Sequence, residues 1–579
     1  MGVLRARRRL ALLVVAALAP LWLIGIFGRA LWTPDEPREA DIAWRMSQQS
    51  DRTLPELAGV PFLEKPPLSY WMSAAGIRAF GDSPGGARAP NLLYALVTAL
   101  AIGALARAMQ LEAPQALLAA LLAGSALTAF RVQSWLAPDA CLLAGNALAL
   151  LGVWGGYTAP PGRAKLLGYT LMHAGAAIGF MAKSAPGWLV PALALGTLIL
   201  WERRWAELRR AELYAGFALQ ALLIAPWIMS VAREPAGAGA LRTLFWNNLA
   251  GRFAHIEAPP GLDYARGHRN APGKYFRELP LYLLPWTLIM AAALARAWPR
   301  VRAAGGGATA WRFALASSLP LLVLLSFAAT ARDIYAAPSL LGLAVLAALW
   351  AQEAQRAPTR LDSLCVAGTS WLVGLLGAAL LAGLAVLMLS GAASVTAALA
   401  AAGGILLLGG SALRRARRAH ARGALAKSLT LTYAAYAAAV CLSALVAFPV
   451  IDRWQDLGAL GREIRADTRA QPLALLAPDE TTLAMIDHGA SGSYSVLGSD
   501  DRPGVERWFA ARGAQARILV LLPGHAAGDV SRWLSRWHRS PPPGDGTAAA
   551  LIDAGAARLV QRYELPQGRR YALLGPPGA

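Results

Sequence analysis

The chain has 579 residues, of which 56% are hydrophobic and 15% are charged, and its mean hydropathy is +0.42. Soluble domains carry about 25% charged residues, so this composition is typical of a membrane protein and excludes an ordinary soluble domain. The formal net charge is +21, but the basic residues fall in short loops and no nucleic-acid-binding module is recognisable, so we predict no nucleic-acid partner. The three cysteines lie in apolar segments and cannot build a disulfide framework.

Apolar segments recur along the first 450 residues. A bilayer core needs about 20 apolar residues per helix. The segments of that kind are 10–31, 88–109, 115–134, 138–157, 166–182, 185–201, 212–231, 276–298, 311–330, 334–351, 364–390, 393–413 and 428–450. We therefore predict an α-helical polytopic membrane protein with about 13 transmembrane helices. The first segment is long and ends without a small-residue cleavage site, so we interpret it as a retained helix rather than a signal peptide.

The basic loops predict the orientation of these helices. With a cytoplasmic N-terminus, every strongly basic short loop falls on the cytoplasmic side, as the positive-inside rule requires. An odd number of helices then places the tail from Ile451 outside. Polar residues from distant parts of the chain fall together on the outer side. They are Asp35, Glu64, Lys65, Asp139, Lys183, the loop 232–275, Arg332 and Asp333.

The first outer loop, residues 32–86, carries the most specific polar pattern. Asp35 follows a proline directly after the first apolar segment, where a carboxylate can act as a general base. The alternative is that Asp35 caps the amphipathic stretch 39–47. Lys65 lies in a Glu-Lys-Pro-Pro step, where a lysine can meet a phosphate or can snorkel at the membrane surface. The two prolines exclude a helix interior at this step.

Further polar residues lie at the outer ends of later segments. Asp139 begins the fourth segment, where a carboxylate can serve chemistry or simply complement the helix dipole. Lys183 lies between two segments with no acid nearby in sequence, so we expect a phosphate partner for it. Arg332 and Tyr335 begin a late segment, and an arginine there can form a bidentate fork with phosphate. Glu64 and His268 are candidate ligands for a divalent metal, although no recognised zinc spacing is present.

The tail, residues 451–579, is less hydrophobic and mixes two patterns. Residues 473–476 and 518–522 are typical of buried strands, and residues 504–513 and 530–537 of helices. We predict one small α/β domain, on the periplasmic side, after a transmembrane domain of residues 1–450. No phosphate-binding loop or dinucleotide fingerprint is present, so we predict no nucleotide cofactor and no ATP-driven transport.

These motifs together resemble the ArnT-like, protein-mannosyltransferase-related glycosyltransferases of the GT-C membrane class. The segments that carry the resemblance are Pro34–Ala40, Phe62–Trp71, Ala87–Asn91, Ala137–Asp139, Asn248–Phe253, His268–Pro272 and Arg332–Tyr335. The resemblance implies a GT-C fold and transfer of a sugar from a polyprenyl (undecaprenyl) phosphate carrier, at the periplasmic face of a bacterial inner membrane. It leaves the acceptor open among lipid A, another glycolipid, a protein and a polysaccharide.

The resemblance also implies roles for individual residues. Asp35 and Asp139 match catalytic positions, and Lys65 and Arg332 match positions at the donor phosphate. With the residue patterns above, we predict Asp35, Lys65 and Asp139 as catalytic residues and Lys65, Lys183, Arg332 and Tyr335 as donor-phosphate ligands. Glu64 and His268 match positions where relatives hold a divalent metal. The alternatives are a surface-polysaccharide ligase or polymerase, and a transporter of lipid-linked sugars. A transporter predicts polar residues near the bilayer midplane, whereas here they lie at the outer rim.

Overall fold

The computed structural model describes residues 2–248, 271–303, 307–328, 332–468, 471–487, 494–498, 502–523 and 546–578. The chain divides into two compact units. The helical unit comprises residues 1–29, 46–55 and 61–448, and the C-terminal unit comprises residues 30–45, 56–60 and 449–579. The start of the first outer loop therefore packs with the tail of the chain, which follows it by more than 400 positions.

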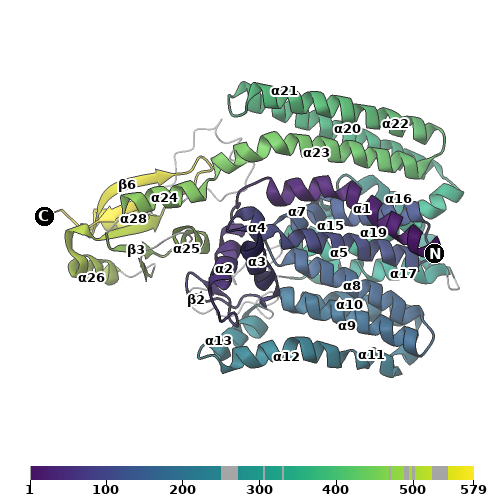
Figure 1. Cartoon of the computed structure of the whole chain (residues 1–579), viewed down its shortest axis with the longest axis horizontal. Helices are drawn as coiled ribbons and strands as arrows, with labels where there is room; N and C mark the ends of the chain where they lie inside the picture. Colours follow the sequence, from purple (N-terminus) through teal and green to yellow (C-terminus); the bar gives the residue numbers. More distant parts are fainter. Residues whose placement is uncertain are drawn as a thin grey trace. The chain divides into compact units, whose positions relative to one another are not determined.

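The helical unit consists mainly of α-helices that run side by side (Figure 1). Its α-helices are α1 (Gly2–Phe27), α3 (Leu68–Phe80), α4 (Pro84–Arg88), α5 (Pro90–Ala108), α6 (Ala113–Ser125), α7 (Leu127–Ser134), α8 (Asp139–Thr158), α9 (Arg163–Lys183), α10 (Pro186–Glu202), α11 (Ala211–Ala215), α12 (Phe217–Arg233), α13 (Gly237–Arg242), α15 (Lys274–Tyr282), α16 (Thr287–Arg302), α17 (Gly307–Ala316), α18 (Leu319–Ser326), α19 (Ala337–Arg356), α20 (Arg360–Leu389), α21 (Val395–Gly404), α22 (Gly410–Ala421) and α23 (Leu425–Trp454), which runs on into the C-terminal unit. Short 3-10 or π turns lie at η1 (Trp205–Arg209), η2 (Thr243–Asn247), η4 (Asp333–Ala336) and η5 (Ile405–Gly409).

The predicted polytopic membrane architecture is confirmed. Within the described residues, nine helical segments are long and apolar enough to cross a membrane, and the bent pair α6–α7 would add a tenth. Three other predicted segments are helical but fall short of that criterion. The segment 185–201 forms the 17-residue α10, the segment 166–182 lies in α9 with charged residues at both ends, and the segment 276–298 breaks into α15 and α16. The number of 13 spans and their orientation stay predictions.

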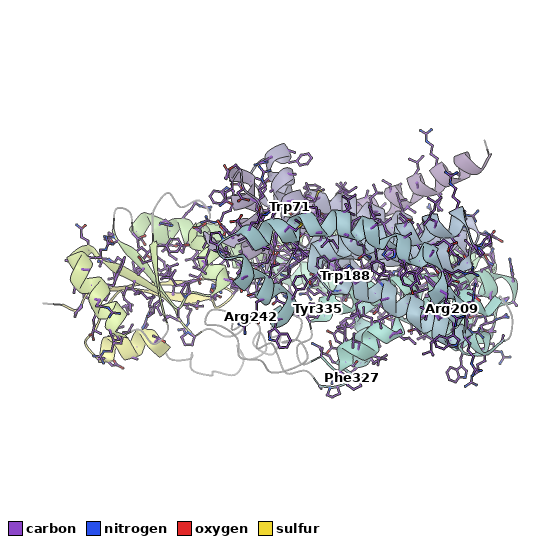
Figure 2. All side chains as sticks on the ribbon, turned by 90° about the horizontal axis from the view of Figure 1, so that it is seen from below. Trp71, Trp188, Arg209, Arg242, Phe327 and Tyr335 are labelled. Atoms are coloured by element: carbon purple, nitrogen blue, oxygen red, sulfur yellow. The ribbon has the colours of Figure 1, made fainter. Side chains whose placement is uncertain are left out.

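The surface of the helical unit is apolar over wide areas. Leu389, Phe327 and Leu407 are more than two-thirds exposed, and several tryptophans are also exposed, among them Trp188. Figure 2 labels Phe327 and Trp188 on this unit. Water-exposed apolar area of this extent is unfavourable, whereas the same side chains are compatible with lipid.

Close contact between α8 and α9 fixes the position of the polar groups at their ends. A Cβ atom added to Gly152 of α8 would lie 2.1 Å from the backbone nitrogen of Met172 in α9, and one added to Gly168 of α9 would lie 2.2 Å from the nitrogen of Gly156. Small residues allow two backbones to approach in this way. Because the two helices are antiparallel and consecutive, the start of α8 lies beside the end of α9.

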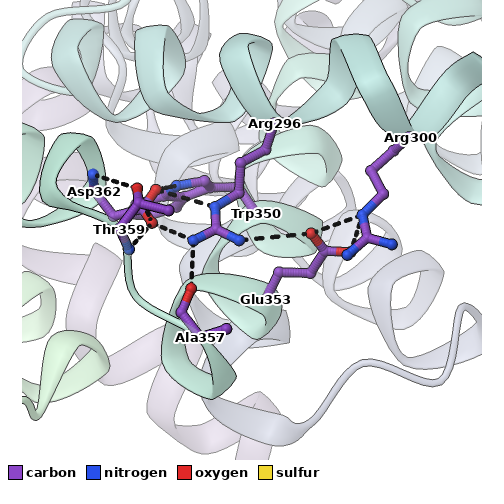
Figure 3. Close-up of polar contacts among 7 residues, drawn as sticks. All are labelled: Arg296, Arg300, Trp350, Glu353, Ala357, Thr359 and Asp362. Carbon is purple, nitrogen blue, oxygen red and sulfur yellow. Dashed lines mark hydrogen bonds and ion pairs between the residues drawn. The ribbon is translucent and has the colours of Figure 1, made fainter.

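A polar junction holds α16, α19 and α20 together at the connection from α19 to α20 (Figure 3). Asp362 and Thr359 form a capping box at the start of α20, and the Asp362 carboxylate also accepts a hydrogen bond from the Trp350 indole at 2.7 Å. Arg296 of α16 forms an ion pair with the same carboxylate and donates to the Ala357 carbonyl oxygen. Glu353 of α19 lies between Arg296 and Arg300. One buried carboxylate thus connects three helices.

The C-terminal unit is a small α/β domain, as predicted. Five strands form a sheet in the order β4-β3-β5-β7-β6, in which β3 pairs in parallel with β4 and β5, and β7 pairs antiparallel with β5 and β6. The strands are β3 (Leu473–Leu476), β4 (Tyr494–Leu497), β5 (Arg517–Leu521), β6 (Arg558–Glu564) and β7 (Arg570–Gly575), and the helices are α24 (Leu457–Asp467), α25 (Glu480–Asp487), α26 (Arg502–Arg512) and α28 (Gly546–Asp553), with the short turn η6 (Gly513–Gln515). The predicted strands 473–476 and 518–522 and the predicted helix 504–513 are confirmed. The predicted helix 530–537 lies outside the described residues.

The first outer loop contributes the remaining elements. Helix α2 (Glu36–Gln48) follows Asp35 directly, and a short hairpin of β1 (Glu56–Leu57) and β2 (Val60–Pro61) follows it. The amphipathic stretch 39–47 is helical, as predicted, and residues 36–45 belong to the C-terminal unit.

Candidate active site

A buried ion pair lies where α8 begins and α9 ends. The Lys183 Nζ atom lies 2.5 Å from the Asp139 Oδ1 atom, and both side chains are about one-tenth exposed or less. The Lys183 ammonium also lies over the ring of Tyr335, 4.6 Å from its centroid. Lys183 has no acid near it in sequence, but the antiparallel contact of α8 and α9 brings Asp139 to it. Three of the predicted site residues form one cluster, and Figure 2 labels Tyr335 within it.

The segment before α19 adds a second charged pair beside Tyr335. Asp333 forms an ion pair with Arg131, which lies in the last turn of α7. The Arg131 guanidinium lies over the Trp135 ring, 5.6 Å from its centroid. The backbone carbonyl oxygen of Arg332 accepts a hydrogen bond from the Tyr275 hydroxyl at 3.0 Å, and the Tyr275 side chain is fully buried. This bond fixes the backbone from which the Arg332 side chain departs.

The Glu-Lys-Pro-Pro step forms a buried turn in the same unit. The Lys65 Nζ atom lies 3.1 Å from the Glu64 Oε2 atom, and Asn248 donates to the Glu64 carbonyl oxygen at 2.7 Å. Leu63 packs in one apolar cluster with Phe180 and Met181 at the end of α9. The turn therefore borders the helix end that carries Lys183. Helix α3 begins immediately after the two prolines, so the prediction that they lie outside a helix interior is confirmed.

The Ala87–Asn91 motif serves to hold neighbouring segments. Arg88 is fully buried and donates to the carbonyl oxygens of Ile26 and Arg29, where α1 ends. Asn91 donates to the Trp135 carbonyl oxygen at 2.8 Å. Buried donors that satisfy exposed carbonyl groups at a helix end stabilise that end. The motif thus secures the segment between α7 and α8 that precedes Asp139.

Asp35 belongs to the C-terminal unit, whereas the other described candidates belong to the helical unit. Its carboxylate is 7% exposed, and its Oδ1 atom lies 3.7 Å from Nη2 of Arg38, one helical turn further on. The Glu39 backbone N–H donates to the Asp35 carbonyl oxygen at 3.1 Å, so Asp35 stands at the first turn of α2. The position suits both the predicted base and the capping alternative, since a helix N-terminus favours a charged carboxylate.

The described residues do not gather a metal site. No group of three or more His, Cys, Asp or Glu side chains in the described part of the chain is arranged to hold a metal ion. The Glu64 carboxylate already contacts a lysine, which competes with a cation for it. His268 lies outside the described residues. A divalent metal at Glu64 and His268 therefore stays a prediction.

Two charged residues of these clusters were absent from the predicted set of site residues. Arg38 contacts Asp35, and its spacing of one helical turn from that carboxylate was a readable signal. Arg131 pairs with Asp333 from a distant segment of the chain, and no local pattern could indicate that partner.

Comparisons with known proteins agree with the motif resemblance. The profile of the dolichyl-phosphate-mannose-protein mannosyltransferase family matches residues 64–229. An undecaprenyl phosphate-alpha-4-amino-4-deoxy-L-arabinose arabinosyl transferase of Pseudomonas aeruginosa is 30% identical over 347 residues, and one of Serratia proteamaculans is 29% identical over the same length. The matched region covers 59% of this chain and 59% of each relative.

A solved structure extends the likeness in fold to almost the whole chain. The crystal structure of ArnT from Cupriavidus metallidurans bound to undecaprenyl phosphate superposes with a TM-score of 0.69, covering 97% of both chains at 18% sequence identity. The apo structure of the same protein gives the same TM-score at 19% identity. The predicted resemblance is confirmed: the chain has the fold of ArnT and resembles the ArnT-like, protein-mannosyltransferase-related membrane glycosyltransferases.

Proposed function

We propose that the chain is an integral-membrane glycosyltransferase of the bacterial inner membrane. It moves a sugar from a polyprenyl phosphate carrier, such as undecaprenyl phosphate, to an acceptor on the periplasmic side. The observation that carries the proposal is the buried Lys183–Asp139 pair beneath the Tyr335 ring, bordered by the Glu64–Lys65 turn. Buried ionisable groups in membrane segments are costly to maintain and usually serve a function.

The cations of the helical unit suit a lipid phosphate as the leaving group. Lys183 and Lys65 each form an ion pair with a carboxylate in a buried position. An arriving phosphate provides a second anion for these lysines, and the Arg332 guanidinium can add a bidentate contact. Positive charge placed where the phosphate gains charge on departure lowers the barrier to transfer.

The reaction itself needs a base and a departing phosphate. An acceptor hydroxyl oxygen attacks the anomeric carbon and forms the new C–O bond, while the bond from that carbon to the phosphate oxygen breaks. The electron pair leaves with the polyprenyl phosphate, and the hydroxyl proton passes to the Asp35 carboxylate. Attack opposite the leaving group inverts the anomeric configuration. Asp139 holds Lys183 in place for the phosphate.

The acceptor and the sugar are open within this proposal. Curated relatives are named for 4-amino-4-deoxy-L-arabinose on undecaprenyl phosphate, so that donor is the first to test. Lipid A, another glycolipid, a protein and a polysaccharide are the acceptor candidates. A divalent metal at Glu64 and His268 is compatible with the proposal, and no step of the reaction described above depends on it.

The test is a transfer assay with purified detergent-solubilised protein and a panel of radiolabelled polyprenyl-phosphate sugars. Wild type is compared with Asp35→Asn and with Asp51→Asn, an exposed carboxylate of the same loop that serves as the matched control. We expect label to leave one carrier with wild type and the control, and to remain on it with Asp35→Asn. If folded wild type releases label from no carrier, the proposal is wrong and transport or polysaccharide ligation becomes the better explanation.

A further inference from the structure

Two arginines of the first-loop helix pair with two carboxylates of one helix in the tail. Arg38 of α2 forms an ion pair with Glu480 at the start of α25, and Arg45 forms one with Asp487 at its end. Both pairs join residues that are 442 positions apart in the chain. Since both pairs have the same separation, α2 and α25 run in the same direction and in register over two helical turns. All four residues belong to the C-terminal unit.

The backbone immediately before Asp35 is also held by the tail. The Asp452 carboxylate accepts from the Trp32 indole at 2.7 Å and from the Ala30 backbone N–H at 3.0 Å. The Thr33 hydroxyl donates to Gln455 at 3.0 Å, and the Thr481 hydroxyl of α25 donates to the Pro34 carbonyl oxygen at 3.2 Å. Asp35 is therefore bracketed by tail contacts on both of its sides in the sequence.

The charges at the Arg38–Glu480 pair bear directly on the proposed base. The Arg38 guanidinium is shared among Glu480, Glu39 at 2.7 Å and Asp35 at 3.7 Å, and its side chain is 8% exposed. Glu480 thus takes up part of the positive charge of the guanidinium that also contacts Asp35. A guanidinium that pairs more closely with a carboxylate favours its charged form and weakens it as a base.

We infer that α25 of the C-terminal unit is a positioning element for the first outer loop, and that Glu480 is the positioning residue that sets the place and basicity of Asp35 through Arg38. Two further contacts join α25 to the same segment: Asp487 pairs with Arg45, and the Thr481 hydroxyl donates to the Pro34 carbonyl oxygen. The inference rests on the proposed function for the role of Asp35, and it gives the C-terminal unit a role in positioning that residue. Glu480 itself need not touch either substrate.

The experiment compares Glu480→Gln with Glu480→Asp in the full chain, and with Glu506→Gln as the matched control. Glu506 pairs with Arg502 on the exposed surface of α26 in the same unit, where an ion pair contributes little. Two readouts are taken from each protein. One is hydrogen–deuterium exchange of backbone amides in α2 and in β5, and the other is the pH profile of kcat and the donor KM.

We expect Glu480→Gln to speed exchange in α2 by about tenfold while exchange in β5 stays unchanged. Because a small displacement of a reacting group has a large effect on rate, kcat falls by about 10- to 100-fold with the donor KM within about twofold. The acidic limb of the pH profile moves to lower pH, since Asp35 becomes a weaker base. Glu480→Asp restores most of the rate, and Glu506→Gln matches wild type in both readouts.

Unchanged exchange in α2 of Glu480→Gln overturns the inference, whether or not the protein is active. Equal acceleration of exchange in α2 and β5 also overturns it, because that result marks a general loss of stability of the unit. A wild-type protein that transfers no sugar contradicts the proposed function instead, and the exchange data then decide on the positioning role alone. The two failures are therefore distinguishable.

Discussion

The buried charges of the two units differ in composition. In the helical unit the described candidate lysines lie in ion pairs with carboxylates, as in Lys183–Asp139 and Lys65–Glu64. Around α2 in the C-terminal unit, several carboxylates of the described residues share two arginines. Asp35, Glu39 and Glu480 lie around Arg38, and Asp41 and Asp487 lie around Arg45. In the proposed function, the first region receives the donor phosphate and the second supplies the base.

The largest effect is expected at the proposed base. Asp35→Asn keeps the size of the side chain and removes its ability to accept a proton, so we expect the transfer rate to fall by about 10²- to 10⁴-fold with little change in the donor Kd. Rate and donor binding are measured on the same preparation, with Asp51→Asn as control. A variant that keeps more than half of the wild-type rate would show that the Asp35 carboxylate does not serve as the base.

A smaller effect on binding is expected in the helical unit. Lys183→Met removes the cation and leaves Asp139 buried without it, so we expect the donor Kd to rise by about 10- to 100-fold, as for the loss of a charged hydrogen bond. Direct binding of a fluorescent polyprenyl phosphate measures this change.

The double variant Lys183→Met with Asp139→Asn separates binding from folding. Replacing both partners removes the uncompensated carboxylate, so thermal stability recovers relative to Lys183→Met alone while donor binding stays weak. Equal donor affinity in wild type and the double variant contradicts the role of this pair in holding the phosphate.

The two regions also differ in how far sequence predicted them. The hydrophobic runs indicated the long apolar helices of the helical unit and the strands β3 and β5, because a buried or lipid-facing segment needs an apolar run that can be read locally. Short helices such as α3 and α13 were not predicted. The Lys183–Asp139 contact depends instead on the glycine-mediated approach of α8 to α9, which joins two segments whose charges look unrelated in sequence. Nothing local to α2 indicated its pairing with α25, since each arginine and its partner are 442 residues apart.

A buried ion pair outside the candidate site should affect stability only. Arg296→Met leaves the Asp362 carboxylate, which is almost fully buried, without its guanidinium partner at the junction of α16, α19 and α20. Removal of one partner from such a pair costs about 3 kcal/mol, and the partial exposure of Arg296 keeps the value near the lower end of the usual range. We expect a lower thermal unfolding temperature with an unchanged donor Kd. A higher donor Kd in the variant would extend the functional region of the helical unit to this junction.

The smallest effect is a pH dependence of stability at Asp41, in the carboxylate-rich region. Burial raises the pKa of the Asp41 carboxyl group to about 8, with the neighbouring Asp487 carboxylate adding to the increase and Arg45 opposing it. Tyr494, whose hydroxyl donates to Asp487 at 3.3 Å, and Arg465 complete the charged and titratable groups around the pair. The folded unit therefore holds a proton that the unfolded chain releases near pH 4.

The sign follows from that proton. The stabilisation is fully present below the pKa of Asp41 in the unfolded chain and is lost as the pH rises toward 8, by at most about 1.4 kcal/mol per pH unit. Asp41→Asn keeps an acceptor for the Ala58 backbone N–H, which lies 2.9 Å from the carboxylate, and cannot titrate. We expect the wild-type unfolding temperature to decrease between pH 5 and pH 8 and that of the variant to stay level. A parallel decrease in both proteins would assign the dependence to other groups and leave Asp41 a structural member of the region, because any group that takes up a proton on folding produces a slope of this sign.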